Sequence, residues 1–317
     1  MKKSFLLVLS TLCLVLTGCY VENTASTKDR TLIIASDYLN ESDSLIFSDF
    51  AKAKNVRIII KQIDPASIAS SIKSKPYAHG IDLVMLRSLY SVENIYDSTL
   101  YQRIDEFRSN FEAPEHFISE KYRFIGLGVD PFVFVSNPDS NFVINNYDEL
   151  KYTPFINLLS EEDIIPMFSN LMTKMDKVES YDWMKSVLQN EKKRETVNKS
   201  QAKSIPTVLT TLENYSSNFK NDSILQNYSE MSFPNSTTSG TFYNLRTASI
   251  TAQAQHFSDA VSFIEYYTTK ENNEALNENL HTLPIFRVAD ASRLYRIDSK
   301  DVMQYYKSFL RILKSLT

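Results

Sequence analysis

The sequence predicts an α/β protein with a mostly parallel sheet, in which the chain crosses from one lobe to another. Short apolar runs alternate with segments of helical spacing, at 31–35, 44–54, 56–61, 65–75 and 81–86. Strand–helix–strand units of this kind place their strands in parallel. Strands buried on both faces are almost continuously apolar, as these runs are. A longer apolar stretch, 122–136, is interrupted at Asp130-Pro131, where we expect the crossover between lobes.

The remaining elements follow from the same signals. In 65–75, Ile68 and Ile72 lie four positions apart and therefore share one face of a helix. Further along the chain we expect a helix and loop at 91–110, a helix start at 146–150, helical structure over 155–195 with a break near Pro166, a strand at 207–211, a loop at 232–241, and helices at 258–269 and 301–316.

Composition and motifs exclude several classes of function. The net charge is −4 and the longest basic tract is Lys192-Lys193-Arg194, so nucleic acid is not an expected partner. The chain has 5 glycines and neither a phosphate-binding nor a dinucleotide-binding glycine motif. It has no His-Glu-x-x-His and no Gly-x-Ser-x-Gly motif. We therefore expect neither enzyme activity nor a required cofactor.

The amino terminus has the layout of a bacterial secretory signal. Lys2 and Lys3 precede an apolar run that is too short to span a bilayer, and Leu16-Thr17-Gly18-Cys19 follows. This end resembles the lipobox of bacterial lipoproteins, which implies a signal peptide over 1–18 and lipidation of Cys19. Residues 19–30 would then be a flexible tether. The protein would lie at the outer face of a membrane, periplasmic or extracellular. A plain signal peptide or a buried helix is the alternative.

Three later segments resemble motifs of the extracellular solute-binding proteins of ABC importers, and most closely those of the ferric-iron-binding branch. They are Trp183 to Asn190, Asn235 to Asn244, and Ala260 to Tyr266. The resemblance implies a two-lobed periplasmic-binding-protein type II fold, in which each lobe is a mostly parallel sheet flanked by helices and the ligand binds between the lobes. It implies that lobe 1 comprises 31–130 with 236–286, and lobe 2 comprises 131–235 with 287–317.

The resemblance also implies site residues. In the ferric branch, a loop that ends in Asn-x-Tyr-Tyr supplies two tyrosine ligands. Here Tyr215 occupies the first position and Ser216 the second, and Ser216 cannot supply a phenolate. The loop after the first strand would add Tyr38, Asp37 and Glu41. Asn198, Asn214 and Ser216 would line the ligand or an anion. These residue types suit Fe(III), a hard cation that prefers anionic oxygen ligands.

The expected role is a lipid-anchored, monomeric binding protein that delivers a solute, ferric iron in the first instance, to an ABC permease. A hinge motion would close the lobes on the ligand. Two alternatives stay open. The same fold could bind an organic solute (a sugar, a polyamine or a thiamine-like compound) or an oxyanion. It could also serve as a surface lipoprotein without a transport role.

Overall fold

The computed structural model describes residues 30–38, 41–64, 67–73, 80–87, 100–118, 123–140, 142–160, 163, 177–234 and 241–288. The predicted signal peptide, almost all of the predicted tether and the predicted helix 301–316 lie outside these residues. No helix in the described ranges combines the length and the hydropathy needed to cross a membrane.

The described strands form one nine-stranded sheet in the order β2-β1-β3-β9-β4-β7-β5-β6, and β8 pairs with β4 beside this path. The strands are β1 (Thr31–Ser36), β2 (Arg57–Gln62), β3 (Leu83–Leu86), β4 (Ile125–Ser136), β5 (Phe155–Asn157), β6 (Glu191–Lys193), β7 (Thr207–Thr211), β8 (Glu230–Ser232) and β9 (Tyr243–Ile250). β1 is parallel to β2 and β3, and β5 is parallel to β6 and β7. The antiparallel strands β4 and β9 join these two parallel groups.

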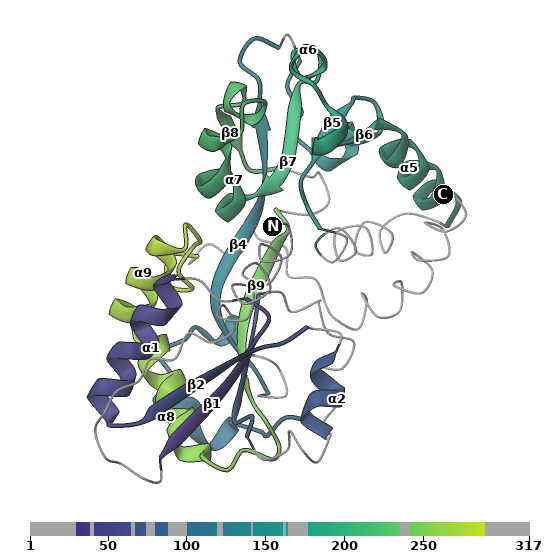
Figure 1. Ribbon diagram of the computed structural model, residues 1–317. Coiled ribbons are helices and arrows are strands. Elements are labelled where there is room, and N and C mark those ends of the chain that lie inside the picture. The colour runs from purple at the N-terminus through teal and green to yellow at the C-terminus, as the bar shows by residue number, and fades with distance from the viewer. Residues whose placement is uncertain are drawn as a thin grey trace, which may run out of the picture.

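Helices cover the sheet in two lobes (Figure 1). The described α-helices are α1 (Glu41–Lys54), α2 (Ile68–Lys73), α5 (Lys177–Asn190), α6 (Lys199–Ala202), α7 (Leu212–Asn218), α8 (Phe257–Thr268) and α9 (Lys270–Asn279). Short 3₁₀ helices lie at Asp105–Asn110, Glu115–Phe117, Tyr147–Lys151, Arg194–Thr196, Phe219–Asn221 and Leu225–Asn227. We call lobe 1 the part built on β1, β2, β3 and β9, and lobe 2 the part built on β5, β6, β7 and β8.

β4 belongs to both lobes, and Figure 1 shows it running from one to the other. Its residues up to Pro131 pair with β9, and those from Phe132 on pair with β7. The expected crossover between the lobes at Asp130-Pro131 is confirmed, because the pairing partner of β4 changes there. The expected interruption of the strand is wrong, because β4 is continuous over Ile125–Ser136. A proline is tolerated here because it stands where the pairing partner changes, and Pro131 cannot donate a ladder hydrogen bond. The predicted division of residues between the lobes stays a prediction, and 289–317 lie outside the described residues.

The predicted strands 31–35, 56–61, 81–86 and 207–211 are confirmed with small shifts in their ends, as are the helices 44–54, 65–75 and 258–269. The prediction of helix over all of 155–195 is wrong at both ends, where β5 and β6 are strands of three residues. Such short strands carry too little sequence pattern to be distinguished from helix. β9 was not predicted, since its sequence mixes Arg246 and Asn244 with apolar residues although the whole strand is buried.

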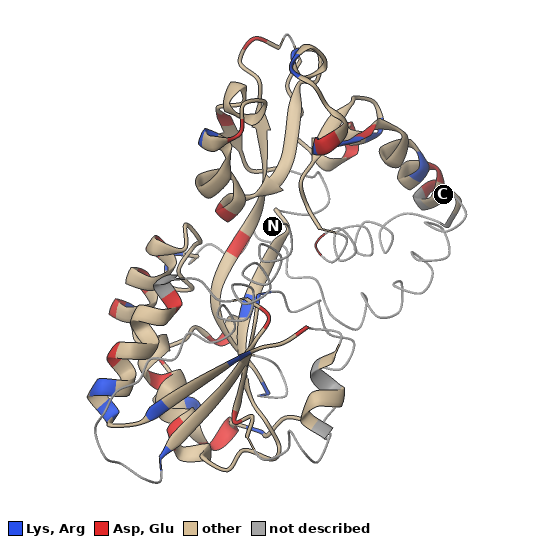
Figure 2. Cartoon of the chain, viewed as in Figure 1, with Lys and Arg blue, Asp and Glu red and all other residues tan. Residues whose placement is uncertain are grey.

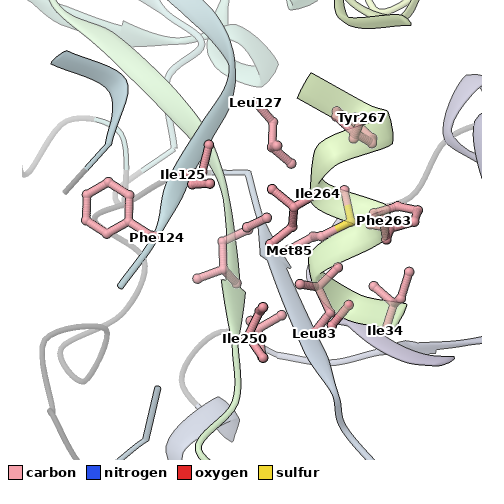
Figure 3. Close-up of a cluster of buried hydrophobic side chains, with 14 of the residues drawn as sticks. Ile34, Leu83, Met85, Phe124, Ile125, Leu127, Ile250, Phe263, Ile264 and Tyr267 are labelled. Atoms are coloured by element: carbon pink, nitrogen blue, oxygen red, sulfur yellow. The ribbon is translucent and has the colours of Figure 1, made fainter. Parts of the chain in front are cut away.

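The core of lobe 1 lies between the sheet and α8 (Figure 3). Ile34, Leu83 and Met85 project from β1 and β3, and they meet Phe263 and Ile264 on α8. All of these side chains are almost fully buried. This packing holds the parallel strands in place, so the loops that follow β1 and β3 start from a rigid base.

Lobe 2 has a smaller core of its own. Val133 and Val135 of β4 and Val208 of β7 form its centre, with Phe219 and Tyr228 packed around them. In Figure 2 the charged residues lie mainly on helices and loops, whereas most of the strands are uncharged and the middle of β4 carries an acidic position. The acidic residue of β4 is Asp130, at the junction of the two lobes.

Candidate functional site

Three strands end at the junction of the lobes, and each is followed by a polar or charged residue. Asp37 and Tyr38 follow β1, Arg87 follows β3, and Glu213 lies two residues beyond β7. In open α/β sheets, ligands bind beyond the carboxyl ends of parallel strands. β1 and β3 are parallel neighbours, so their ends meet at the same edge. With Asp130 of β4, these four residues form what we call the interlobe cluster.

Tyr38 and Glu213 join the two lobes directly. The Tyr38 hydroxyl donates a hydrogen bond to Oε1 of Glu213. The other carboxylate oxygen of Glu213, Oε2, lies 3.8 Å from Nη2 of Arg87. The Arg87 guanidinium also lies over the Tyr38 ring, 5.4 Å from its centroid, within the range of a cation–π contact. A phenol, a carboxylate and a guanidinium are thus held together between the lobes.

Local turns hold the two partners in place. The hydroxyl of Ser36 donates to the Tyr38 carbonyl at 2.6 Å and accepts from the Tyr38 amide at 3.3 Å. On the other side, the Glu213 amide donates to Oδ1 of Asp130 at 3.0 Å. Thr211 caps α7 through its side chain, which accepts from the Asn214 amide. The first turn of α7, with Glu213 in it, is therefore fixed against β4.

Asp130 is a buried carboxyl group, 5% exposed. Burial, and to a smaller extent the Glu213 carboxylate, raise its pKa to about 7. The Glu213 amide, Arg87 and the Thr211 side chain lower that pKa only in part. Among the described residues, its Oδ2 atom has no hydrogen-bond partner. A buried carboxyl group that is incompletely paired is costly to stability and is a mark of functional sites.

Carboxyl groups outnumber cations around Arg87. Burial lowers the pKa of Arg87, but Asp163, Glu213 and Asp130 raise it above its usual value. Asp37 is the fourth carboxyl group: its Oδ1 accepts from the Arg87 amide at 2.9 Å, and burial raises its pKa. A region with this excess of carboxyl groups favours a cationic ligand over an anionic one.

A second buried pair lies next to the cluster within lobe 1. Nη2 of Arg246 donates to both carboxylate oxygens of Asp43, at 2.7 and 2.6 Å. The Arg246 guanidinium lies 5.9 Å from the centroid of the Tyr38 ring. Asp43 is the direct ion-pair partner of Arg246, and Arg246 also lowers the pKa of Asp37 in the interlobe cluster, although burial still leaves that pKa raised. The pair ties the start of α1 to β9.

The structure brings together some of the predicted site residues and places others elsewhere. Asp37 and Tyr38 lie in the interlobe cluster. Tyr215 lies on α7, where its hydroxyl donates to the Ser229 carbonyl at 3.3 Å and its ring packs edge-on against Phe219 with centroids 4.9 Å apart. Glu41 is the first residue of α1, and its side chain lies outside the described residues.

The three predicted ligand- or anion-binding residues make local contacts. Asn198 caps α6 with a capping box, at the far end of lobe 2 in Figure 1. The Asn214 side chain donates to Thr210 Oγ1 at 2.9 Å and accepts from Asn218 at 2.6 Å. Ser216 is half-buried on α7. The assignment of these residues to ligand binding stays a prediction.

Arg87, Asp130 and Glu213 were not among the predicted site residues. Two of them had a signal in the sequence. Asp130 is a charged residue inside a long apolar run, and Arg87 directly follows an apolar strand. Glu213 had no such signal, because it precedes the tyrosine that the family motif singles out. Within the described ranges, no group of three or more His, Cys, Asp or Glu side chains could hold a metal ion. In the interlobe cluster, the Tyr38 phenol lies beside Glu213 and is a further oxygen that could take part in binding a metal.

No protein-family model matches the sequence, and no curated protein matches it. Solved structures do match. The ferric binding protein from Campylobacter jejuni aligns with a TM-score of 0.72 at 16% identity, over 90% of this chain and 99% of that one. The Trichodesmium protein IdiA (FutA), solved in complex with iron and citrate ligands, has the same values of TM-score, identity and coverage. Iron-bound HitA from Pseudomonas aeruginosa aligns with a TM-score of 0.72 at 11% identity, over 90% and 99% of the two chains.

The chain has the two-lobed periplasmic-binding-protein type II fold. The interlobe cluster lies between the two lobes, where the resemblance drawn from the sequence places the ligand. β9 and β4 lie between the parallel strands of lobe 1 and those of lobe 2 in the sheet, so they join the two lobes. At identities of 11–16%, the similarity to these structures establishes the fold.

Proposed function

We propose that this protein is a solute-binding protein that holds a ferric ion between its lobes and passes it to an ABC permease. The observation that carries the proposal is the contact of the Tyr38 phenol with the Glu213 carboxylate between the lobes, within an excess of carboxyl groups. The described structural neighbours add support, since several of them are ferric-binding proteins by name. Nothing in this role makes or breaks a covalent bond.

The chemistry of the cluster suits a hard cation. Phenolate and carboxylate oxygens are the ligands that hard, highly charged ions prefer. A free phenol has a pKa of about 10, but a bound trivalent ion strongly favours its deprotonated form. The proton that Tyr38 donates to Glu213 would then be displaced by the ion. The same charge balance argues against an oxyanion as the ligand, because it would meet the carboxyl groups of Asp130 and Glu213.

Ferric titration of the purified full chain in mild detergent tests this function. With a chelated Fe(III) donor, we expect a saturable visible absorbance band, since tyrosinate bound to Fe(III) gives a charge-transfer transition. We also expect iron to raise the melting temperature, because a ligand that binds only the folded state stabilises it. Tyr152→Phe, a change at a tyrosine that is 74% exposed in lobe 2, is the matched control and should leave the band intact. No band and no change in melting temperature would contradict the ferric assignment.

An organic cation such as a polyamine is the second candidate. The excess of carboxyl groups and the aromatic ring of Tyr38 favour a ligand of this class as well. Isothermal titration with spermidine separates the two. Saturable heat with spermidine, together with no absorbance band from iron, would replace ferric iron with an organic cation.

We also propose that the chain is anchored by lipid at Cys19 on the outer face of a membrane and acts as a monomer. The support is the basic start, the short apolar run and the Leu-Thr-Gly-Cys ending at Cys19. Replacing Cys19 with alanine is expected to move the protein from the membrane fraction to the soluble fraction or to leave its signal peptide uncleaved. Fractionation and mass spectrometry of the amino terminus measure this. A Cys19→Ala protein that is processed and membrane-bound like the wild type would contradict lipidation.

A further inference from the structure

We infer that the carboxylate of Glu213 is the lobe 2 ligand for the bound cation. Tyr215, two residues further along α7, is a packing residue. The lobe 1 ligand is the Tyr38 phenolate. This inference rests on the proposed function, because it names the residues of the same site. It differs from the expectation drawn from the sequence, in which Tyr215 supplies the phenolate.

The helical geometry of α7 points Glu213 and Tyr215 in different directions, so only one of them can face lobe 1. Residues two positions apart on a helix do not face the same side. Glu213 faces lobe 1, where its carboxylate contacts Tyr38 and Arg87. Tyr215 therefore faces another direction, and its ring packs on Phe219 and against the core of lobe 2. Its hydroxyl donates to a backbone carbonyl of the same lobe, that of Ser229.

The Tyr38–Glu213 contact has the form of a site for a cation. The Tyr38 hydroxyl donates one hydrogen bond to Oε1 of Glu213 across the lobe boundary. Two oxygens within hydrogen-bonding reach of each other can also be neighbouring ligands of one cation. When a cation binds, Tyr38 loses its proton to solvent and both oxygens become anionic ligands. The ion then takes the place of that proton as the link between the lobes.

The environment of Asp130 is a second observation that supports a cation between Tyr38 and Glu213. Asp130 is 5% exposed, its Oδ1 accepts from the Glu213 amide at 3.0 Å, and its Oδ2 has no hydrogen-bond partner among the described residues. A buried carboxyl group whose second oxygen has no partner is ionised only at a cost, and a cation nearby would favour its charged form. Arg87 supplies part of this positive charge, but it is shared with Asp163 and Glu213. A cation on Glu213 would lie near Asp130 and supply the rest.

The experiment compares Tyr38→Phe, Glu213→Gln and Tyr215→Phe with the wild type and with Tyr152→Phe. Each full-length variant, purified in mild detergent, is titrated with chelated Fe(III). The readouts are the charge-transfer band and the affinity measured by competition with the chelator, and circular dichroism checks that each variant is folded. The three site variants keep the shape of the side chain, so each should fold.

We expect Tyr38→Phe to abolish the band. We expect Glu213→Gln to keep a band but to weaken iron binding by about 100-fold or more, since even residues behind metal ligands contribute about 10- to 100-fold. Tyr215→Phe should leave the band and the affinity within about twofold of wild type, as should Tyr152→Phe. Loss of the band in Tyr215→Phe, or unchanged affinity in Glu213→Gln, would overturn this inference and leave the ferric function standing. Failure of the wild type to bind iron would overturn the proposed function itself.

Discussion

Replacing Asp43 with alanine is expected to lower the free energy of unfolding by about 3–5 kcal/mol. The side chain of Asp43 is fully buried and that of Arg246 is 9% exposed. Burial lowers the pKa of Arg246, but Tyr267 and Asp43 together raise it above its usual value, so the guanidinium is charged when the protein is folded. Removing the carboxylate leaves that charge buried without its partner. Urea denaturation followed by circular dichroism measures the loss.

Two further variants separate the buried charge from other effects. In Asp43→Leu combined with Arg246→Met, both charges are gone, and we expect a stability within about 2 kcal/mol of wild type. Asp49→Ala is the control on the same helix. The Asp49 side chain is 64% exposed, and its Oδ1 lies 3.9 Å from Nζ of Lys52 in an exposed ion pair. Its loss should change the free energy of unfolding by less than about 1 kcal/mol. If Asp43→Ala unfolds at the same urea concentration as Asp49→Ala, the buried pair has no such role.

Replacing Phe263 with alanine is expected to lower the free energy of unfolding by about 3–5 kcal/mol, because it leaves a cavity at the centre of lobe 1. The Phe263 ring is fully buried. Its centroid lies 5.2 Å from that of Phe50 in an edge-on contact, 5.5 Å from Phe47 and 5.8 Å from Tyr267. Figure 3 shows Phe263 on α8 among the side chains of the sheet. Calorimetric or urea-induced unfolding measures the change.

The size of the side chain is the controlled variable in this second experiment. Phe263→Leu keeps most of the volume and should lose less than about 2 kcal/mol. Phe142→Ala removes an aromatic ring that is 48% exposed in lobe 2 and should change stability by about 0.5 kcal/mol or less. A Phe263→Ala protein as stable as Phe142→Ala would show that α8 is not held to the sheet by this ring.

Much of lobe 1 could be predicted because its strands repeat one simple pattern. β1, β2 and β3 are short apolar runs separated by helices, and strand–helix–strand units have few packing solutions. β9 escaped prediction because it is buried while carrying Asn244 and Arg246, whose partners lie far away in the sequence. Asn244 donates to Asp163 at 2.7 Å, and Arg246 to Asp43. A polar residue in a buried strand is predictable only once its partner is known.

In the candidate site, too, some residues could be predicted from the sequence and others could not. Asp37 and Tyr38 could be predicted because they follow the first strand, and Tyr215 because it matches a motif. A sequence motif does not encode which side of α7 each of its residues faces. Glu213 and Tyr215 are two positions apart, and that spacing points one toward lobe 1 and the other into lobe 2. The sequence predicts an interruption of the strand at Asp130, whereas Asp130 is a buried carboxyl group of a continuous strand.

The sequence by itself determined the α/β class, the parallel strands of lobe 1, the strand before α7 and the absence of glycine-rich phosphate loops, because each of these depends on residues close together in the chain. Only the tertiary structure decided that β4 runs through both lobes and that Tyr38, Arg87, Asp130 and Glu213 meet between them. The contacts of Glu213 with Asp130 and with Tyr38 join residues 83 and 175 positions apart. They arise from the packing of whole strands and helices, and no local pattern in the chain encodes which distant side chain a buried charge will meet.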